Sequence, residues 1–314
     1  MGEAGKGMLA MIGAATIWGL SPLYYKQLAH VPPLEVLSHR TLWSFVIFFV
    51  LLAGQGRLRE FAHSLKDRRA VFQTALAGGM IALNWFVFIL SVQTGHTVEA
   101  SLGYYIFPLV AVALGALVLG ERLSVAQWLA VALAALAVVV LTLGLGVTPW
   151  IALILSVTFG IYGLIKKRMA AGPVLSVTGE VLLLLPLALI WLAGVNLAGW
   201  VDVTARAGGY FGNNLHDTFM LFLAGLITAG PLILMSYAAR RLTLSTVGLL
   251  QYLNPTLQFM VAVLVFRELF TAWHGFAFAL IWAALVIYSS ATWRREKLRR
   301  REAARSSMPD TTDM

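Results

Sequence analysis

Cysteine is absent from the chain, and charged residues are scarce. Without thiols the chain cannot be a disulfide-stapled secreted scaffold, and it cannot carry thiol catalysis, cysteine-type zinc sites or iron–sulfur clusters. Charged residues make up 12% of the 314 residues and hydrophobic residues 60%, with a mean hydropathy of +0.82. A water-soluble domain carries roughly 25% charge. The composition therefore excludes a disordered chain or a coiled coil and predicts an integral membrane protein.

Long polar stretches and enzyme motifs are also missing. The longest polar stretches are 54–71, 195–216 and 294–314, each shorter than the roughly 50 residues that a domain needs. The chain has no phosphate-binding glycine loop and no His-Glu-x-x-His motif, and its aspartates lie in loops, in the tail or at a span edge. We therefore predict that the protein is not an enzyme and that it uses no cofactor and no metal.

Apolar segments long enough to cross a bilayer fill most of the chain. A crossing helix needs about 20 mainly apolar residues. Such segments cover residues 7–28, 35–53, 72–93, 98–119, 125–144, 148–166, 174–194, 217–238, 244–266 and 271–293. Most of the 23 lysines and arginines fall in the N-terminus, the even-numbered loops and the tail. Since positive residues stay on the cytoplasmic side, both termini are predicted to be cytoplasmic.

An internal repeat relates the two halves. A shift of 147 residues places Tyr105 and Pro108 on Tyr252 and Pro255, and a shift of 144 places Trp18-Gly19-Leu20 on Tyr162-Gly163-Leu164. Each half holds an odd number of segments, so the second must cross the membrane in the opposite sense. We predict an all-α membrane protein with ten transmembrane helices in two inverted five-helix repeats, 1–147 and 148–293, followed by a basic, disordered tail, 294–314.

Ionisable residues gather where the first segment ends and the second begins: Lys26, Glu35, His39 and Arg40. Such groups are costly in hydrocarbon and mark candidate sites. Glu35 and His39 are four residues apart, so a helix places them on one face. The group could bind a zwitterionic solute or carry protons. An interfacial charge cluster explains the same residues equally well.

Other carboxylates lie near segment ends. Glu99 opens the fourth segment, where it could cap the helix or carry a proton. Glu180, inside the seventh segment, is either a buried protonated acid or an interfacial one. Glu121 and Glu268, beside arginines, are interpreted as structural caps.

Amides occupy the interior of two segments. Asn84 stands beside Trp85 midway along the third, where an amide must either bridge helices or line a cavity. The polar residues of the ninth segment precede a proline: Gln251, Tyr252 and Asn254. Pro255 removes a backbone donor, which predicts a kinked, partly opened helix.

These motifs together resemble the RarD branch of the EamA family, in the drug/metabolite transporter superfamily, over residues 7–293. The motifs are Trp18-Gly19, Glu35 with Ser38-His39-Arg40, Asn84-Trp85, Glu99 to Tyr104, Pro108-Leu109, Gly120-Glu121-Arg122, Leu242 to Thr246, Gln251-Tyr252 and Pro255-Thr256. The resemblance implies two inverted repeats, a central cavity, a bacterial inner-membrane location and efflux of small organic compounds; the branch name is tied to chloramphenicol sensitivity. Two residues depart from the pattern, because Phe107 replaces a usual Asn and Arg267 a usual Gly.

The favoured hypothesis is a secondary-active or facilitative inner-membrane transporter that exports a small metabolite or drug, amino-acid-like or chloramphenicol-like, by alternating access. Its expected partners are a small-molecule substrate, the lipid bilayer and protons as the candidate coupling ion, with no nucleic acid. The candidate substrate-binding residues are Lys26, Glu35, His39, Arg40, Asn84, Trp85, Glu99, Tyr104, Gln251, Tyr252 and Asn254. Glu35, His39 and Glu99 are the candidate proton carriers. The alternatives are a membrane-embedded enzyme acting on lipid and a non-transporting membrane partner protein.

The inverted repeat makes a topological prediction. Green fluorescent protein fused after Arg122 should fluoresce, because that loop is cytoplasmic, and alkaline phosphatase fused after Arg267 should be active, because that loop is on the other side. Swapping the two reporters should abolish both signals. Two fusions reporting the same compartment would contradict the antiparallel arrangement.

Overall fold

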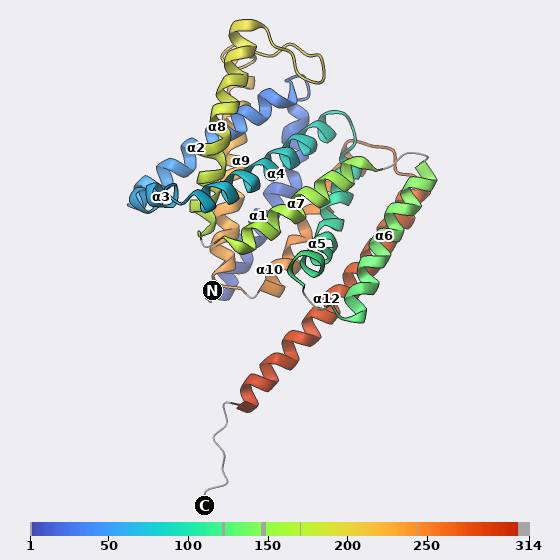
Figure 1. Cartoon of the computed structure of the whole chain (residues 1–314). Coiled ribbons are helices and arrows are strands. Elements are labelled where there is room, and N and C mark those ends of the chain that lie inside the picture. Colours follow the sequence, from blue (N-terminus) through green and yellow to red (C-terminus); the bar gives the residue numbers. More distant parts are fainter. Residues whose placement is uncertain (1, 121–122, 146–148, 170, 243, 307–314) are drawn as a thin grey trace, which may run out of the picture.

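A computed structural model describes residues 2–120, 123–145, 149–169, 171–242 and 244–306, and in this part of the chain the secondary structure is helical apart from one isolated bridge (Figure 1). The elements are α1 (Glu3–Gln27), α2 (Pro33–Gly54), α3 (Leu58–Ser64), α4 (Arg68–Gln93), α5 (Thr97–Leu119), α6 (Val125–Leu145), α7 (Trp150–Arg168), α8 (Pro173–Ala198), α9 (Leu215–Ala239), α10 (Leu244–Gln251), α11 (Leu253–Met260), the π-helical turn η1 (Val261–Val265) and α12 (Ala272–Ser306). Within these described ranges, ten stretches are long and apolar enough to span a membrane. The prediction of an all-α membrane protein with ten apolar helices is therefore confirmed.

The bundle has two distinct ends. The start of α1 and the end of α12 lie at one end, which we call the terminal face (Figure 1). The segment 199–214, which joins α8 to α9, lies at the opposite end, which we call the distal face. The first two connections on the distal face are the turns 28–32 and 94–96.

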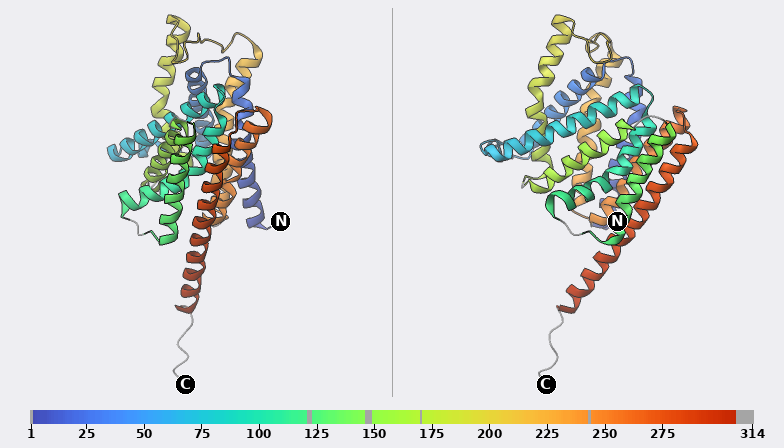
Figure 2. Two further views of the ribbon diagram at one scale, coloured as in Figure 1. Left: turned by 90° about the vertical axis from the view of Figure 1, so that its right-hand side faces the viewer. Right: turned by 45° about the vertical axis from the view of Figure 1, so that its right-hand side comes forward.

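Helices α6 and α12 lie side by side at one edge of the bundle (Figure 2). Small residues line their contact, with Ala130, Ala134 and Ala137 of α6 in one buried cluster with Ala277 and Ala284 of α12. In a membrane, small side chains allow two helices to approach closely and to gain van der Waals contact. This pair therefore forms a unit beside the helices that surround the centre.

The ninth span is broken where the proline predicts it. α10 ends at Gln251 and α11 begins at Leu253, because Pro255 has no N–H to donate to the carbonyl of Gln251, four residues earlier. The side chain of Asn254 does not bond to that carbonyl; its Oδ1 accepts a hydrogen bond from Gln258 Nε2 at 2.9 Å. The break thus removes the helical hydrogen bond that the Gln251 carbonyl would otherwise accept.

The ninth span ends in a strained turn that caps another helix. Arg267 has a φ of 55°, in the left-handed region that favours glycine. Glu268 follows, and its Oε2 accepts a hydrogen bond from Val98 N, at the start of α5, at 2.8 Å. Glu268 therefore caps a helix, but it caps the start of α5 and not the end of the span that it follows; Glu121 lies outside the described residues.

The prediction of disorder from residue 294 onward is wrong for residues 294–306. α12 continues without interruption to Ser306 and extends beyond the rest of the bundle (Figure 1). The segment is rich in Arg, Lys, Glu and Ala, which have high helix propensity. A helix already nucleated within the membrane can propagate through such a sequence at little cost. Residues 307–314 lie outside the described part.

A short helix, α3, begins the polar stretch between the second and third spans. Arg57 Nε donates to Glu60 Oε2 at 2.7 Å across one helical turn. The guanidinium holds the pKa of the Glu60 carboxyl below its ordinary value. The pair is a surface contact, so we assign it little stability.

Close contact between α2 and α9 depends on Gly225. A β-carbon at this position would lie 2.5 Å from Trp43 Cβ and 2.6 Å from the Trp43 carbonyl carbon. We expect Gly225→Ala to destabilise the protein by about 1–3 kcal/mol through overpacking, seen as a lower melting temperature in detergent. Gly230→Ala is the matched control, since a β-carbon there meets no atom within 4 Å on the same helix. Equal melting temperatures for the two variants would contradict this packing argument.

Candidate functional site

A cavity of about 680 Å³ lies in the middle of the bundle. Its lining includes residues at helix ends on the terminal face, among them Lys166 near the end of α7, Pro173 at the start of α8 and Met235 near the end of α9. No described residue of the distal connections 28–32, 94–96 or 199–214 lines it. The cavity therefore extends from the centre of the bundle toward the terminal face and is closed toward the distal face.

Arg40 is the charged residue at the inner part of this cavity. It lies seven residues into α2 and is only 5% exposed. Its Nη1 donates to the Tyr25 hydroxyl at 2.6 Å, and the guanidinium carbon lies 4.0 Å from the centre of the Trp85 ring. The arginine is thus held by a neutral hydroxyl and by the face of an indole, which is a cation–π contact.

Asn84 ties together three helices beside Arg40. Its Nδ2 donates to the Leu155 carbonyl at 2.9 Å and to Thr158 Oγ1 at 3.0 Å, both on α7. Its Oδ1 accepts from the Tyr104 hydroxyl, on α5, at 2.9 Å. The amide is completely buried, so it fixes the wall of the cavity and leaves little capacity to bind a solute.

An aromatic wall runs from Tyr104 toward the terminal face. The rings of Phe88 and Tyr104 are 5.6 Å apart, those of Tyr104 and Phe159 are 6.0 Å apart, and those of Phe159 and Tyr162 are stacked at 5.8 Å. Phe107 packs against Phe159 at 4.9 Å. Aromatic rings at these spacings present a large, rigid apolar surface to a ligand.

A buried ion pair marks the outer part of the cavity. Lys166 Nζ lies 2.6 Å from Glu180 Oε1 and also donates to Ser176 Oγ. The Tyr162 hydroxyl donates to Glu180 Oε2 at 3.1 Å. Glu180 is 1% exposed. Each oxygen of its carboxylate has a hydrogen-bond donor, and the lysine balances its charge.

The structure brings together some of the residues singled out in the sequence and separates others. The cavity is lined by Arg40, Asn84, Trp85, Tyr104, Gln251, Tyr252 and Asn254. Outside the described lining lie Lys26, Glu35, His39 and Glu99. Lys26 is exposed, with its Nζ 5.4 Å from the Phe266 ring centre, and Glu99 is half-buried at the start of α5. The binding roles proposed for all eleven stay predictions.

The chain is similar in sequence to proteins that have already been described. A sequence model of the EamA-like transporter family matches residues 5–143. A protein of Vibrio cholerae described as an uncharacterized transporter is 41% identical over 287 residues, which cover 91% of this chain and 93% of that protein. Protein RarD of Streptomyces exfoliatus is 41% identical over 303 residues, covering 96% of this chain and 93% of its own. The chain belongs to the RarD branch of the EamA family.

One solved crystal structure has a fold similar to that of this EamA protein, with a TM-score of 0.59. The match covers 90% of this chain and 96% of the other, at 18% sequence identity. At that identity the likeness shows the fold alone. Family membership and the ten apolar helices make this chain a multi-pass membrane transporter.

The distal face of this EamA transporter is closed by contacts between the turn 28–32 and the segment 199–214. Glu35 is completely buried, and its two carboxylate oxygens accept hydrogen bonds from Gly209 N at 2.9 Å and Tyr210 N at 2.8 Å. His39, one turn further along α2, stacks on the Phe211 ring at 4.6 Å. Glu35 and His39 thus hold the distal segment.

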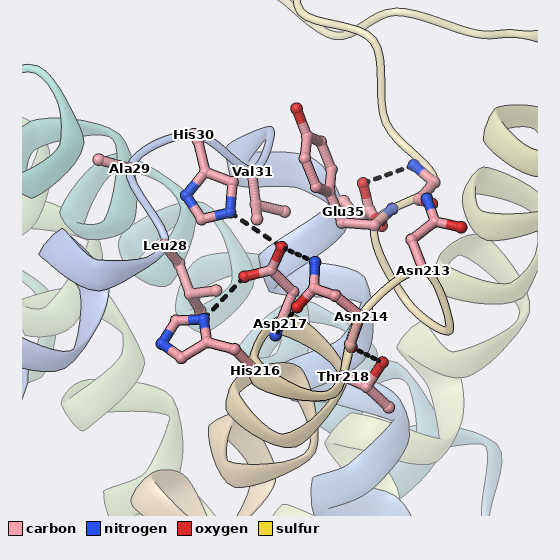
Figure 3. A network of polar contacts seen from close by, with 12 residues as sticks. Leu28, Ala29, His30, Val31, Glu35, Asn213, Asn214, His216, Asp217 and Thr218 are labelled. Carbon is pink, nitrogen blue, oxygen red and sulfur yellow. Dashed lines mark hydrogen bonds and ion pairs between the residues drawn. The ribbon is translucent and has the colours of Figure 1, made fainter.

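Further contacts complete this closure. Arg206 donates to the Ala29 carbonyl, and its Nη2 donates to Gln93 Oε1 at 2.8 Å. His30 Nε2 and His216 Nδ1 each lie 3.0 Å from an oxygen of Asp217, at the start of α9 (Figure 3). These bonds join segments that lie far apart in the sequence and together close the distal face.

Several lining residues were not among the sequence candidates. Lys166, Tyr162, Phe159, Trp18 and Tyr25 line the cavity but were not singled out as binding residues. One signal was available, because the repeat places Trp18 on Tyr162, and both residues line the cavity. Nothing in the sequence marks Lys166 as a cavity residue, since Lys167 and Arg168 follow it to the end of α7 and the three together resemble an ordinary positive flank.

The ion pair supports a double-variant prediction. Lys166→Met or Glu180→Leu alone leaves one buried ionisable group without its partner and should cost about 3–5 kcal/mol. The double variant should cost less than the sum of the two, because it replaces the pair by apolar groups. Melting temperatures of the four proteins in one detergent measure this coupling. Strictly additive losses would show that the two side chains act independently.

Proposed function

We propose that this protein is a secondary-active or facilitative transporter of the bacterial inner membrane that exports a small organic metabolite or drug by alternating access. The observation that carries the proposal is a central cavity that reaches the terminal face and is closed at the distal face. A site accessible from one side at a time is what alternating access requires. The predominance of lysine and arginine near the termini supports a cytoplasmic terminal face.

The packing of the helices supports an inverted repeat. α1 packs on α9 while α7 packs on α4, and α2 packs on α9 while α8 packs on α4. α5 contacts α7 while α11 contacts α1. If each span of the first five is replaced by the corresponding span of the last five, and the reverse, the first helix pair of each comparison becomes the second. Two halves of this kind can swap conformations, so the distal closure could move to the terminal face.

Protons are the coupling ion that we propose for an active mechanism. Glu35 and His39 bond or stack on the segment 199–214, so a proton on Glu35 would weaken the two hydrogen bonds that it accepts. Glu99 lies on the distal side of α5, near Glu268. In this scheme these groups act on the distal gate and not on the substrate.

The chemistry of the lining supports a small, largely apolar cargo. Aromatic rings cover much of the wall, and most of the exposed surface of the lining is apolar, as in sites that bind drug-sized organic molecules. Chloramphenicol-like drugs fall in this class; amino-acid-like compounds fit it only through an apolar side chain, because their ammonium and carboxylate groups need polar partners.

A filled cavity should stop transport. Gly163 lines the cavity, and a β-carbon there would meet no atom within 4 Å, so the ring of Gly163→Phe adds bulk at the cavity wall without a clash at its β-carbon. In proteoliposomes loaded with chloramphenicol or with mixed radiolabelled amino acids, we expect at least a tenfold lower efflux from this variant than from the wild type. Gly79→Phe is the control, since Gly79 is exposed, has open space and does not line the cavity. The absence of flux of any solute with the wild type would overturn the proposed function.

A further inference from the structure

Charge within the cavity is unbalanced. The charged residues in its described lining are Arg40, Lys166 and Glu180. Lys166 and Glu180 form an ion pair at 2.6 Å and neutralise each other. Arg40 has no carboxylate within ion-pair distance in the described part of the chain, which leaves the lining with one net positive charge at the position of Arg40.

The contacts of Arg40 do not replace a counter-ion. Its Nη1 is used by the Tyr25 hydroxyl, and one face of its guanidinium is covered by Trp85. Nε is buried and, among the residues that the structure describes, has no hydrogen-bond partner. A buried cation is expensive unless it is paired and its donors are satisfied. The guanidinium is therefore prepared for an anion that the protein itself does not supply.

The free part of Arg40 has a shape that fits one class of anion. Nη1 is occupied by Tyr25, and no described residue accepts a hydrogen bond from the Nε edge of the planar guanidinium, an edge that matches the two oxygens of a carboxylate. Because Nε itself is buried, a ligand carboxylate would pair with it only after a shift of the Arg40 side chain or its neighbours. Next to it begins the aromatic wall of Phe88, Tyr104 and Phe159. A ligand that satisfies both features has a carboxylate at one end and an apolar or aromatic body at the other.

We propose that the cavity binds organic monocarboxylates with an aromatic or apolar body, with the carboxylate on the Arg40 guanidinium. This inference rests on the proposed function and narrows its substrate class. A single charge on the ligand is favoured because it balances the single excess charge of the lining. A phosphate monoester would bring two charges into a site that can neutralise one.

Binding of matched probes tests this proposal. Purified protein in nanodiscs is titrated with phenylacetate, phenylacetamide and phenyl phosphate by calorimetry. We expect phenylacetate to bind at least tenfold more tightly than either of the others. Arg40→Gln should reduce the preference for phenylacetate over phenylacetamide to less than twofold, whereas Arg40→Lys should keep part of it. Arg59→Gln, which removes an exposed arginine on α3, should leave the preference unchanged.

A second measurement does not depend on the folding of an Arg40 variant. Ser21 lines the cavity one helical turn before Tyr25, the residue bonded to Arg40, and the chain has no native thiols. In a Ser21→Cys variant, phenylacetate should slow maleimide labelling and phenylacetamide should not.

Three outcomes would overturn the proposal: equal binding of the acid and the amide, tighter binding of phenyl phosphate, or no saturable binding and no protection by phenylacetate. The proposed transport function would survive each of these as long as Gly163→Phe still blocks flux of some solute.

Discussion

Polar groups inside this bundle must find their partners within the protein, because hydrocarbon offers them no hydrogen bonds. Asn84 meets the requirement with three hydrogen bonds to two other helices. Glu180 meets it with Lys166 and Tyr162. Arg40 meets it only in part, through one hydroxyl and one indole ring. Asn84 and Glu180, whose hydrogen bonds are satisfied, belong to the walls of the cavity. Arg40, whose guanidinium is satisfied only in part, marks its centre.

The same requirement shapes the two ends of the molecule differently. At the distal face, Glu35 of α2 accepts hydrogen bonds from main-chain N–H groups of the segment 199–214. In return, Arg206 of that segment donates to a main-chain carbonyl of the turn 28–32. At the terminal face, the ends of α7, α8 and α9 border the cavity and leave it open. The bundle thus has dissimilar ends, and it is this asymmetry that gives the cavity one entrance.

Much of the fold could be predicted because its signals are local. Each span is visible as an apolar run of sufficient length, and the break in the ninth follows from the missing N–H of Pro255. The site could be predicted only in part. Glu35 and Arg40 stand five residues apart on α2, and both are ionisable residues near a span end. Their different helical phase directs Glu35 to the distal segment and Arg40 to the cavity, and that phase has meaning only once the neighbouring helices are in place.

The sequence by itself determined the class of protein, the number of apolar helices and the family, because hydropathy and motif spacing are properties of the chain alone. Only the tertiary structure decided which polar groups are paired. Lys166 reaches Glu180 from the preceding helix, and Glu35 reaches Gly209 across 174 positions of sequence. Partners of this kind are set by how helices pack against one another, so the charge left over at Arg40 could be recognised only after every other buried charge in the cavity had been matched.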